Sequence, residues 1–211
     1  MVIAVDSTGL SLLTSQSWNR HKHNRKSMKP TGQLWHKLHI AIDTQTGQIL
    51  SCKDTTSSIT DGAVLPELMD ELPTRNIQAV CADKAYDRFD CRKRIKEEGA
   101  HQRIPPTRDA VHTDDLKHRL SPEKREERQD IFAERDAAIA YFKANMINGS
   151  DKLARQNWKK LTGYHERSLV ETTMWQLKAH TTDQLRSKKP LNMAIECRIK
   201  CKIVNLLNAV A

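Results

Sequence analysis

The sequence has no long hydrophobic run, no signal-peptide pattern and no paired cysteines, and each absence excludes a class of protein. No apolar stretch approaches the ~20 residues of a membrane-spanning helix. The first apolar run reaches a carboxylate at Asp6, too soon for a signal peptide. The five cysteines contain no CxxC pair and lack the spacing of a secreted disulfide framework. We therefore expect an intracellular protein with reduced thiols, in which Cys197 and Cys201 lie in the core rather than bind zinc.

The charge of the chain is strongly positive and unevenly spread. The 211 residues carry 35 Lys and Arg against 26 Asp and Glu, a net charge of +9, and 38% are hydrophobic, enough for one domain with a real core. Residues 1–60 carry 7 basic and 3 acidic side chains and residues 151–211 carry 12 and 5, whereas the middle is nearly neutral. A fold that joins the two ends would form one basic face, typical of proteins that bind polyanions, although a generally basic protein has the same composition.

The first half of the chain predicts one sheet with helices packed against it. Short apolar and β-branched runs predict strands over residues 2–5, 33–43, 49–53, 77–82 and 101–104. Helical periods predict a helix from an N-cap at Asp61 to a stop at Pro73, and another over about 87–98. The order strand, strand, strand, helix, strand, helix, strand is typical of a mixed α/β fold.

The second half of the chain is polar and then helical. Residues 107–130 are dense in charge and predict a solvated loop that leads into a helix. Helical periodicity follows over 131–146, about 165–181 and 191–210. In the last helix, apolar residues at helical spacing predict a stripe that faces the core: Ile195, Ile199, Ile203, Leu206 and Val210.

Acidic residues at two strand ends and polar residues on one helix suggest a reactive site. The first and fourth predicted strands end in Asp6 and Asp83. On the helix over 165–181, four side chains fall within about 60° of one another: Tyr164, Arg167, Glu171 and Lys178. An apolar stripe beside them, made of Val170, Met174 and Leu177, would anchor this helix on the core. Without the two Asp residues, a solvated Glu and Lys surface helix would explain the pattern equally well.

Three carboxylates that meet in one site need a cation. At ~4 Å and an effective dielectric near 20, each pair repels by about 4 kcal/mol. Oxygen ligands without a matching His or Cys suit a hard divalent ion, Mg²⁺ or Mn²⁺, and two such ions are the usual apparatus for in-line displacement at a phosphodiester. Arg167 and Lys178 could then hold phosphate oxygens.

Three sequence blocks carry a family resemblance. The blocks are Val5-Asp6-Ser7-Thr8, Ala82-Asp83-Lys84-Ala85-Tyr86-Asp87, and the Tyr-x2-Arg-x3-Glu-x6-Lys spacing of Tyr164, Arg167, Glu171 and Lys178. They resemble the signature blocks of the DDE transposases of bacterial insertion sequences, in the insertion-sequence four and five superfamily, and Ser168-Leu169-Val170-Glu171-Thr172 is most similar to the fifth group. The resemblance covers nearly the whole chain, from Asp6 into the last helix.

The resemblance implies a fold, a reaction and a set of roles. It implies one RNase H-like catalytic domain over residues 1–211, which cleaves DNA strands at transposon ends and transfers them to target DNA. Asp6 would bridge two metal ions, Asp83 and Glu171 would each complete one site, and Tyr164, Arg167 and Lys178 would position DNA phosphates. The partners would be DNA and further copies of the chain, as a homodimer or larger, in the bacterial cytoplasm at the nucleoid and not at a membrane.

One departure from the family pattern opens alternatives. Family members normally carry a DNA-binding region before the first catalytic Asp, and only five residues precede Asp6. We therefore expect a catalytic domain without its end-recognition region. The alternatives are a catalytically inactive, truncated DNA-binding remnant that inhibits the full-length transposase, and an RNase H-like nuclease that hydrolyses DNA without strand transfer.

The histidines and tryptophans have simpler explanations than metal binding. His36 and His39, in a strand, and His21 and His23, in a basic loop, are expected to have structural or phosphate-contacting roles. The tryptophans could stack on bases: Trp18, Trp35, Trp158 and Trp175. We expect Trp35 to pack in the core, and Trp175, about 40° from the Glu171 face, to be the best candidate for stacking.

Overall fold

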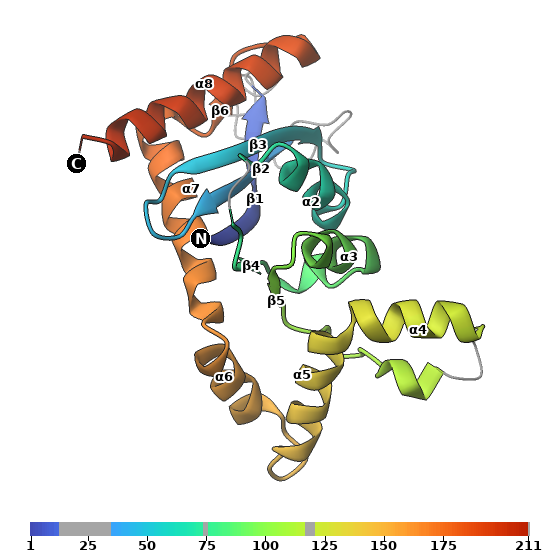
Figure 1. Ribbon diagram of the computed structural model, residues 1–211. Helices are drawn as coiled ribbons and strands as arrows, with labels where there is room; N and C mark the ends of the chain where they lie inside the picture. The colour runs from blue at the N-terminus through green and yellow to red at the C-terminus, as the bar shows by residue number, and fades with distance from the viewer. Residues whose placement is uncertain (13–34, 74–75, 117–120, 211) are drawn as a thin grey trace, which may run out of the picture.

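The computed structural model describes residues 1–12, 35–73, 76–116 and 121–210, and its centre is a mixed sheet (Figure 1). The sheet order is β3-β2-β1-β4-β5. The strands are β1 (Val2–Leu12), β2 (Trp35–Asp43), β3 (Ile49–Thr56), β4 (Ala79–Cys81) and β5 (His101–Arg103). The first three pair antiparallel and β4 and β5 run parallel to β1, while the short β6 (Gln184–Leu185) pairs with the far end of β1. This mixed α/β arrangement confirms the predicted fold class and is consistent with an RNase H-like fold.

Helices cover both faces of the sheet, and the alternation of β1 decides what each face buries. Ile3 and Val5 point to one face, where α2 (Asp61–Asp70) and α3 (Phe89–Glu97) complete the core. Ala4 points to the other, where α7 (Ser168–Thr181) and α8 (Pro190–Asn208) pack. All five cysteines are free, and Cys197 and Cys201 are buried in this second core, as predicted. None of the described helices is long and apolar enough to cross a membrane.

Three helices extend from the β5 side of the sheet (Figure 1). They are α4 (Pro122–Ile131), α5 (Ala133–Ala144) and α6 (Lys152–Leu161). The helix predicted over 131–146 is confirmed as α5, whereas α4 lies in the segment predicted as a charged, solvated loop. The two helices are separated at Phe132, whose ring packs edge-on against Phe89 at 5.8 Å. No helix was predicted over α6, although its Ala154 and Trp158 are buried one turn apart.

The outer stripe of α8 corrects the prediction for the last helix. The five residues predicted to face the core are between 38% and 84% exposed. The buried face of α8 instead consists of Met193, Cys197, Lys200, Cys201 and Val204. Both faces repeat at the helical period, so periodicity could not tell which one meets the sheet. The small Cys side chains allow the helix to approach β3 and α7 closely.

Two smaller predictions are also corrected. Thr60, rather than Asp61, is the N-cap of α2, and Asp61 accepts a hydrogen bond from Lys37 Nζ at 2.9 Å. Trp35 is 42% exposed rather than buried. It begins β2 opposite Ser11, at the end of the sheet, where its ring lies against Gly9.

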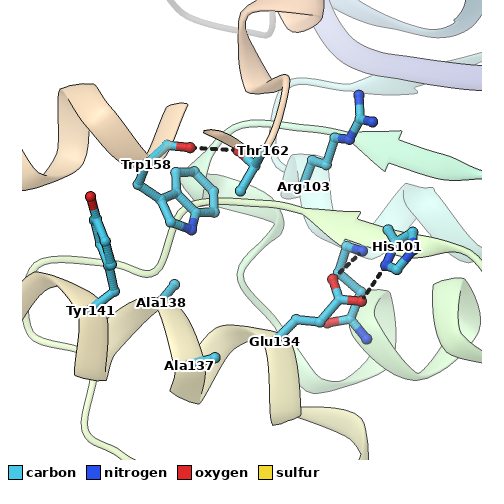
Figure 2. Close-up of a pocket in the computed structure, with 9 residues that line it drawn as sticks. His101, Arg103, Glu134, Ala137, Ala138, Tyr141, Trp158 and Thr162 are labelled. Carbon is cyan, nitrogen blue, oxygen red and sulfur yellow. Dashed lines mark hydrogen bonds and ion pairs between the residues drawn. The ribbon is translucent and has the colours of Figure 1, made fainter. Parts of the chain in front are cut away.

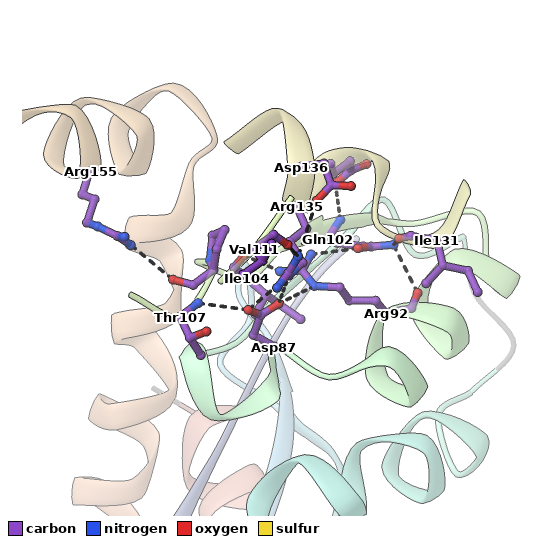
Figure 3. A network of polar contacts seen from close by, with 12 residues as sticks. Asp87, Arg92, Gln102, Ile104, Thr107, Val111, Ile131, Arg135, Asp136 and Arg155 are labelled. Atoms are coloured by element: carbon purple, nitrogen blue, oxygen red, sulfur yellow. Dashed lines mark hydrogen bonds and ion pairs between the residues drawn. The ribbon is translucent and has the colours of Figure 1, made fainter. Parts of the chain in front are cut away.

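A buried polar network ties the helical extension to the sheet (Figure 3). The Arg92 guanidinium on α3 donates to Asp87 Oδ1 at 2.8 Å, to Gln102 Oε1 at 2.9 Å and to the carbonyl of Ile104 at 2.9 Å. Arg135 Nε on α5 donates to the same Asp87 oxygen at 3.1 Å. Burial lowers the pKa of Arg92 and the adjacent Asp87 carboxylate counteracts this. The network fixes the segments that follow β4 and β5.

Candidate active site

Asp6 and Asp83 occupy matching places along the neighbouring parallel strands β1 and β4. Asp83 follows the end of β4, as predicted, but β1 does not end at Asp6 and continues to Leu12, because it pairs with β2 along nearly this whole length. The register pairs Ala4 of β1 with Cys81 of β4, and each Asp lies two residues beyond this rung. The backbone N–H of Ser7 donates to Asp6 Oδ1 at 2.8 Å. The Asp83 side chain caps the short 3-10 helix η1 (Lys84–Tyr86) by accepting from the Ala85 N–H at 2.7 Å. The sheet therefore presents the two carboxylates side by side.

Arg167 connects Asp6 with Glu171. Its Nη1 donates to Asp6 Oδ2 at 2.7 Å, and its Nη2 donates to Glu171 Oε1 one helical turn away. Glu171 lies in the first turn of α7, and Val170, Met174 and Leu177 are buried beneath it, which confirms the predicted anchoring stripe. The guanidinium thus lies between two of the three predicted catalytic carboxylates.

The charges of the site act on the pKa of Asp6. Burial raises this pKa, and the neighbouring Asp83 and Glu171 carboxylates raise it further. The Ser7 N–H and the Arg167 guanidinium lower it. All three predicted carboxylates are therefore close enough to interact electrostatically.

Tyr164 lies beside Arg167 but is buried. Both residues belong to the 3-10 helix η3 (Tyr164–Arg167), before α7 begins at Ser168, and Tyr164 is only 8% exposed. Side chains three residues apart on a 3-10 helix eclipse one another, so Tyr164 and Arg167 share a side of η3. Burial raises the pKa of Tyr164 to about 12, and the charges of Asp83 and Asp6 add to the effect that Arg167 opposes. The α-helix predicted from about residue 165 therefore begins three residues later, at Ser168.

Lys178 lies on α7 beyond Glu171, at a distance along the axis of about 10 Å. It is partly buried and forms no salt bridge with any carboxylate in the described part of the chain. The structure therefore brings Asp6, Arg167 and Glu171 into direct contact and leaves Lys178 apart from them.

The metal ligands that the site offers are the carboxylates of Asp6, Asp83 and Glu171. Among the described residues, no group of three or more His, Cys, Asp and Glu side chains is placed to hold a metal ion. The donors available are carboxylates, which in kind suit a hard divalent cation, and the Arg167 guanidinium supplies the positive charge between Asp6 and Glu171. These carboxylates are chemically suited to such an ion. To bind it, Glu171 would have to break its ion pair with Arg167.

Comparison with known proteins identifies the family. A family model described as "Transposase DDE domain" matches residues 1–206. The chain belongs to the DDE transposase family. No solved structure matches it. Members of this family are polynucleotidyl transferases that act in DNA transposition, so DNA is the expected partner of this transposase domain.

A cavity that the sequence did not predict lies beside Asp83 in this transposase domain. The cavity has a volume of about 290 Å³ and lies between η1, the loop after β5 and α6. Its basic lining includes Lys84, Arg155 and Lys159. The signal in the sequence was the one-turn spacing of Arg155 and Lys159 beside the equally spaced Ala154 and Trp158, which indicates an amphipathic helix.

A second cavity lies on another side of Trp158, between β5, α5 and α6 (Figure 2). It has a volume of about 480 Å³, and none of the predicted site residues lines it. At one end, His101 Nδ1 lies 2.9 Å from Glu134 Oε1, and the Gln102 N–H donates to Glu134 Oε2 at 2.6 Å. Glu134 therefore binds the edge strand of the sheet rather than a reactive group.

The exposure of each side chain distinguishes among the roles predicted for the histidines and tryptophans. His39 is fully buried, its Nε2 lies 2.9 Å from Thr55 Oγ1, and burial lowers its pKa to about 4, so its role is structural. Trp158 is buried, whereas Trp175 is 69% exposed and lies one turn after Glu171. Three further candidates lie outside the described residues: Trp18, His21 and His23.

Proposed function

We propose that this domain cleaves and transfers DNA strands with divalent metal ions held by Asp6, Asp83 and Glu171. The observation that supports the proposal most directly is the matching register of Asp6 and Asp83, with Glu171 joined to Asp6 through Arg167, in a chain of the DDE transposase family. Mg²⁺ or Mn²⁺, as two ions, would activate the attacking oxygen and stabilise charge on the phosphodiester. The insertion-sequence four and five assignment, supported by the spacing from Tyr164 to Lys178, is part of this proposal.

The reaction has two displacements at phosphorus. In the first, a water oxygen bonds to phosphorus at the element end and the bond from phosphorus to the 3′ oxygen breaks. The leaving 3′ oxygen takes up one proton, and the 5′-phosphate releases the other water proton to solvent. The products are a 3′-hydroxyl on the element and a 5′-phosphate on the flank. In the second, this 3′-hydroxyl attacks a target phosphodiester and a target 3′-hydroxyl leaves. Joining two element ends requires two catalytic domains, so the active complex is a homodimer or larger.

Arg167 has two roles in this scheme. Its contacts with Asp6 and Glu171 offset carboxylate repulsion. When Glu171 turns to a metal ion, the guanidinium is free to bind a DNA phosphate in the bidentate manner typical of Arg. Lys178, about two turns further along α7, would hold a phosphate more distant from the reacting one. Tyr164 would contact the strand on the Asp83 side.

A second candidate function is a catalytically inactive DNA-binding remnant that inhibits a full-length transposase. The Arg167 contacts favour it, because a guanidinium already neutralises two of the three carboxylates. The net charge of +9 would support DNA binding in either case. The two functions differ in whether the domain cleaves DNA when Mg²⁺ is supplied.

The decisive variant is Asp83→Asn. Asparagine keeps the N-cap of η1 and removes the charge. We expect Mg²⁺-dependent nicking and joining of DNA that carries the element end to fall about 100-fold or more. The matched control is Glu97→Gln, which removes a charge from the exposed end of α3 and should leave both reactions unchanged.

Each outcome of this assay points to one function. Nicking and joining that survive in Asp83→Asn would overturn the assignment of the site. A wild-type domain that binds DNA but never cleaves it, at any Mg²⁺ or Mn²⁺ concentration, would support the inactive remnant. Nicking without joining would support a nuclease.

A further inference from the structure

We propose that the cavity beside Asp83 binds the sugar–phosphate backbone of one DNA strand, an inference that rests on the proposed function. We call it the α6 pocket. It is lined by Asp83, Lys84, Pro105, Pro106, Arg108, Phe142, Arg155, Trp158, Lys159 and Tyr164. The pocket would hold the strand beside Asp83, so that cations other than Arg167 also contact its phosphates.

The basic residues of the α6 pocket come from three separate segments. Lys84 directly follows Asp83, Arg108 lies in the loop after β5, and Arg155 and Lys159 lie one turn apart on α6. Segments distant in the sequence therefore bring four cations to one cavity. Asp83 is the one carboxylate among the lining residues.

Three of the four cations have no carboxylate partner among the described residues. Arg155 is held in place, since it donates to Asp151 Oδ2 at 2.5 Å. It also donates to the Pro106 carbonyl at 3.2 Å (Figure 3). Lys84, Arg108 and Lys159 form no salt bridge with any carboxylate of the described part of the chain. A pocket with this excess of positive charge beside a strand-cleavage site suits a chain of phosphates, which lysine and arginine bind with release of counterions.

Three aromatic side chains line the α6 pocket and give it its shape rather than its specificity: Phe142, Trp158 and Tyr164. The Trp158 ring lies 5.8 Å from both Phe142 and Tyr164, and Lys159 Nζ lies 5.4 Å from the centre of the Tyr164 ring. These rings are at most 8% exposed, so they offer no open face on which a base could stack. The volume of about 290 Å³ is small for a ligand pocket, so it admits the backbone of one strand of a duplex and not the full width of the duplex. The α6 pocket should therefore bind backbone without reading sequence.

The test is DNA binding by the full chain in chelator, so that no metal-dependent step contributes. The probe is a short duplex of random sequence, and the measurement is the slope of log affinity against log salt. The variant Lys84→Ala/Lys159→Ala should flatten this slope by about 1.8, since each lost phosphate contact removes about 0.9. Between about 50 and 200 mM salt, its loss of affinity should then be about 12-fold smaller than that of the wild type.

The control removes the same amount of charge from α6, outside the pocket. Lys152 and Lys160 are exposed on α6 and do not line the pocket. Lys152→Ala/Lys160→Ala should keep the wild-type slope. Equal slopes in the two double variants, whether both flattened or both unchanged, would overturn the proposal. So would competition by inorganic phosphate at matched ionic strength, because the pocket would then be a small-anion site.

The salt-slope measurement and the nicking assay test two separate proposals, and either proposal can fail while the other stands. If the α6 pocket variant changes the slope but the wild type never nicks DNA, the pocket stands and the catalytic proposal fails. If the wild type nicks DNA but the slope is unaffected, the catalytic proposal stands and the pocket fails.

Discussion

At the scale of single residues, Arg167 sets the charge balance of the site. It donates to Asp6 and to Glu171 at once, while burial and the two other carboxylates raise the pKa of Asp6. Without this guanidinium, the repulsion among the carboxylates would be offset only by the Ser7 N–H on Asp6 and by solvent. The same side chain suits a phosphate, so one residue connects the charge of the site with DNA binding.

His39 is the residue whose environment most directly predicts a pH effect. It is fully buried in β2 and has a pKa of about 4, well below the 6.5 of an exposed histidine. In the unfolded chain His39 becomes protonated below about pH 6.5, whereas in the folded chain it stays neutral until the pH falls to about 4. The contribution of neutral His39 to the free energy of unfolding is therefore fully present above pH 6.5 and is lost as the pH falls towards 4.

We expect the free energy of unfolding to fall by up to about 3 kcal/mol through His39 as the pH is lowered from about 7 to about 4. Urea titrations across this range measure it. His39→Asn should flatten the pH dependence, whatever its effect on absolute stability. His180→Asn, an exposed control on α7, should keep it. An unchanged slope in His39→Asn would contradict the prediction.

At the scale of elements, α8 shows how one helix can carry two apolar faces. Val204 is fully buried against the sheet, whereas Ile199, on the outer face, is 54% exposed. Both lie in regular helical repeats of apolar residues. The two faces differ in that only the face with Val204 packs into the core against the sheet and α7.

Paired alanine variants of α8 measure this difference. Val204→Ala should lower the free energy of unfolding by about 1–3 kcal/mol, because it removes buried methyl groups and leaves a cavity. Ile199→Ala deletes more carbon atoms but should change stability by less than about 0.5 kcal/mol. Chemical denaturation of the monomer at low concentration is the measurement. A larger loss at Ile199 would mean that the faces are assigned wrongly.

At the scale of the whole molecule, the buried network around Asp87 joins the helical extension to the sheet (Figure 3). Arg92 and the Asp87 side chain are at most 1% exposed, and Asp87 also accepts from Arg135 and from the Thr107 N–H at 3.0 Å. These contacts set the position of α5, and through it the α6 pocket, relative to Asp83.

Breaking the network should destabilise the fold and alter the site together. Asp87→Ala leaves the buried Arg92 guanidinium and the partly buried Arg135 guanidinium without their shared carboxylate and should lower the free energy of unfolding by about 3–5 kcal/mol. Asp90→Ala, an exposed neighbour on α3, should have little effect. Thermal or urea unfolding measures both. Equal stability of the two variants would show that Asp87 is not needed to join the parts.

The sequence by itself determined much of the fold and named the candidate site. The order of strands and helices along the chain, the Asp residues that follow the apolar runs of β1 and β4, and the apolar stripe under Glu171 follow from local alternation and helical period, which act within a few residues. The motif spacing was enough to indicate the transposase family. These features are local or motif-like, so they needed no knowledge of packing.

Only the tertiary structure decided which surfaces meet. The burial of one face of α8 rather than the other depends on contacts between segments far apart in the sequence. So do the position of Tyr164 beside Asp83, the Arg167 link from β1 to α7 and the convergence of Lys84, Arg108 and Lys159. Periodicity records which residues share a face but not what that face contacts, and the chemistry of a site depends on those contacts.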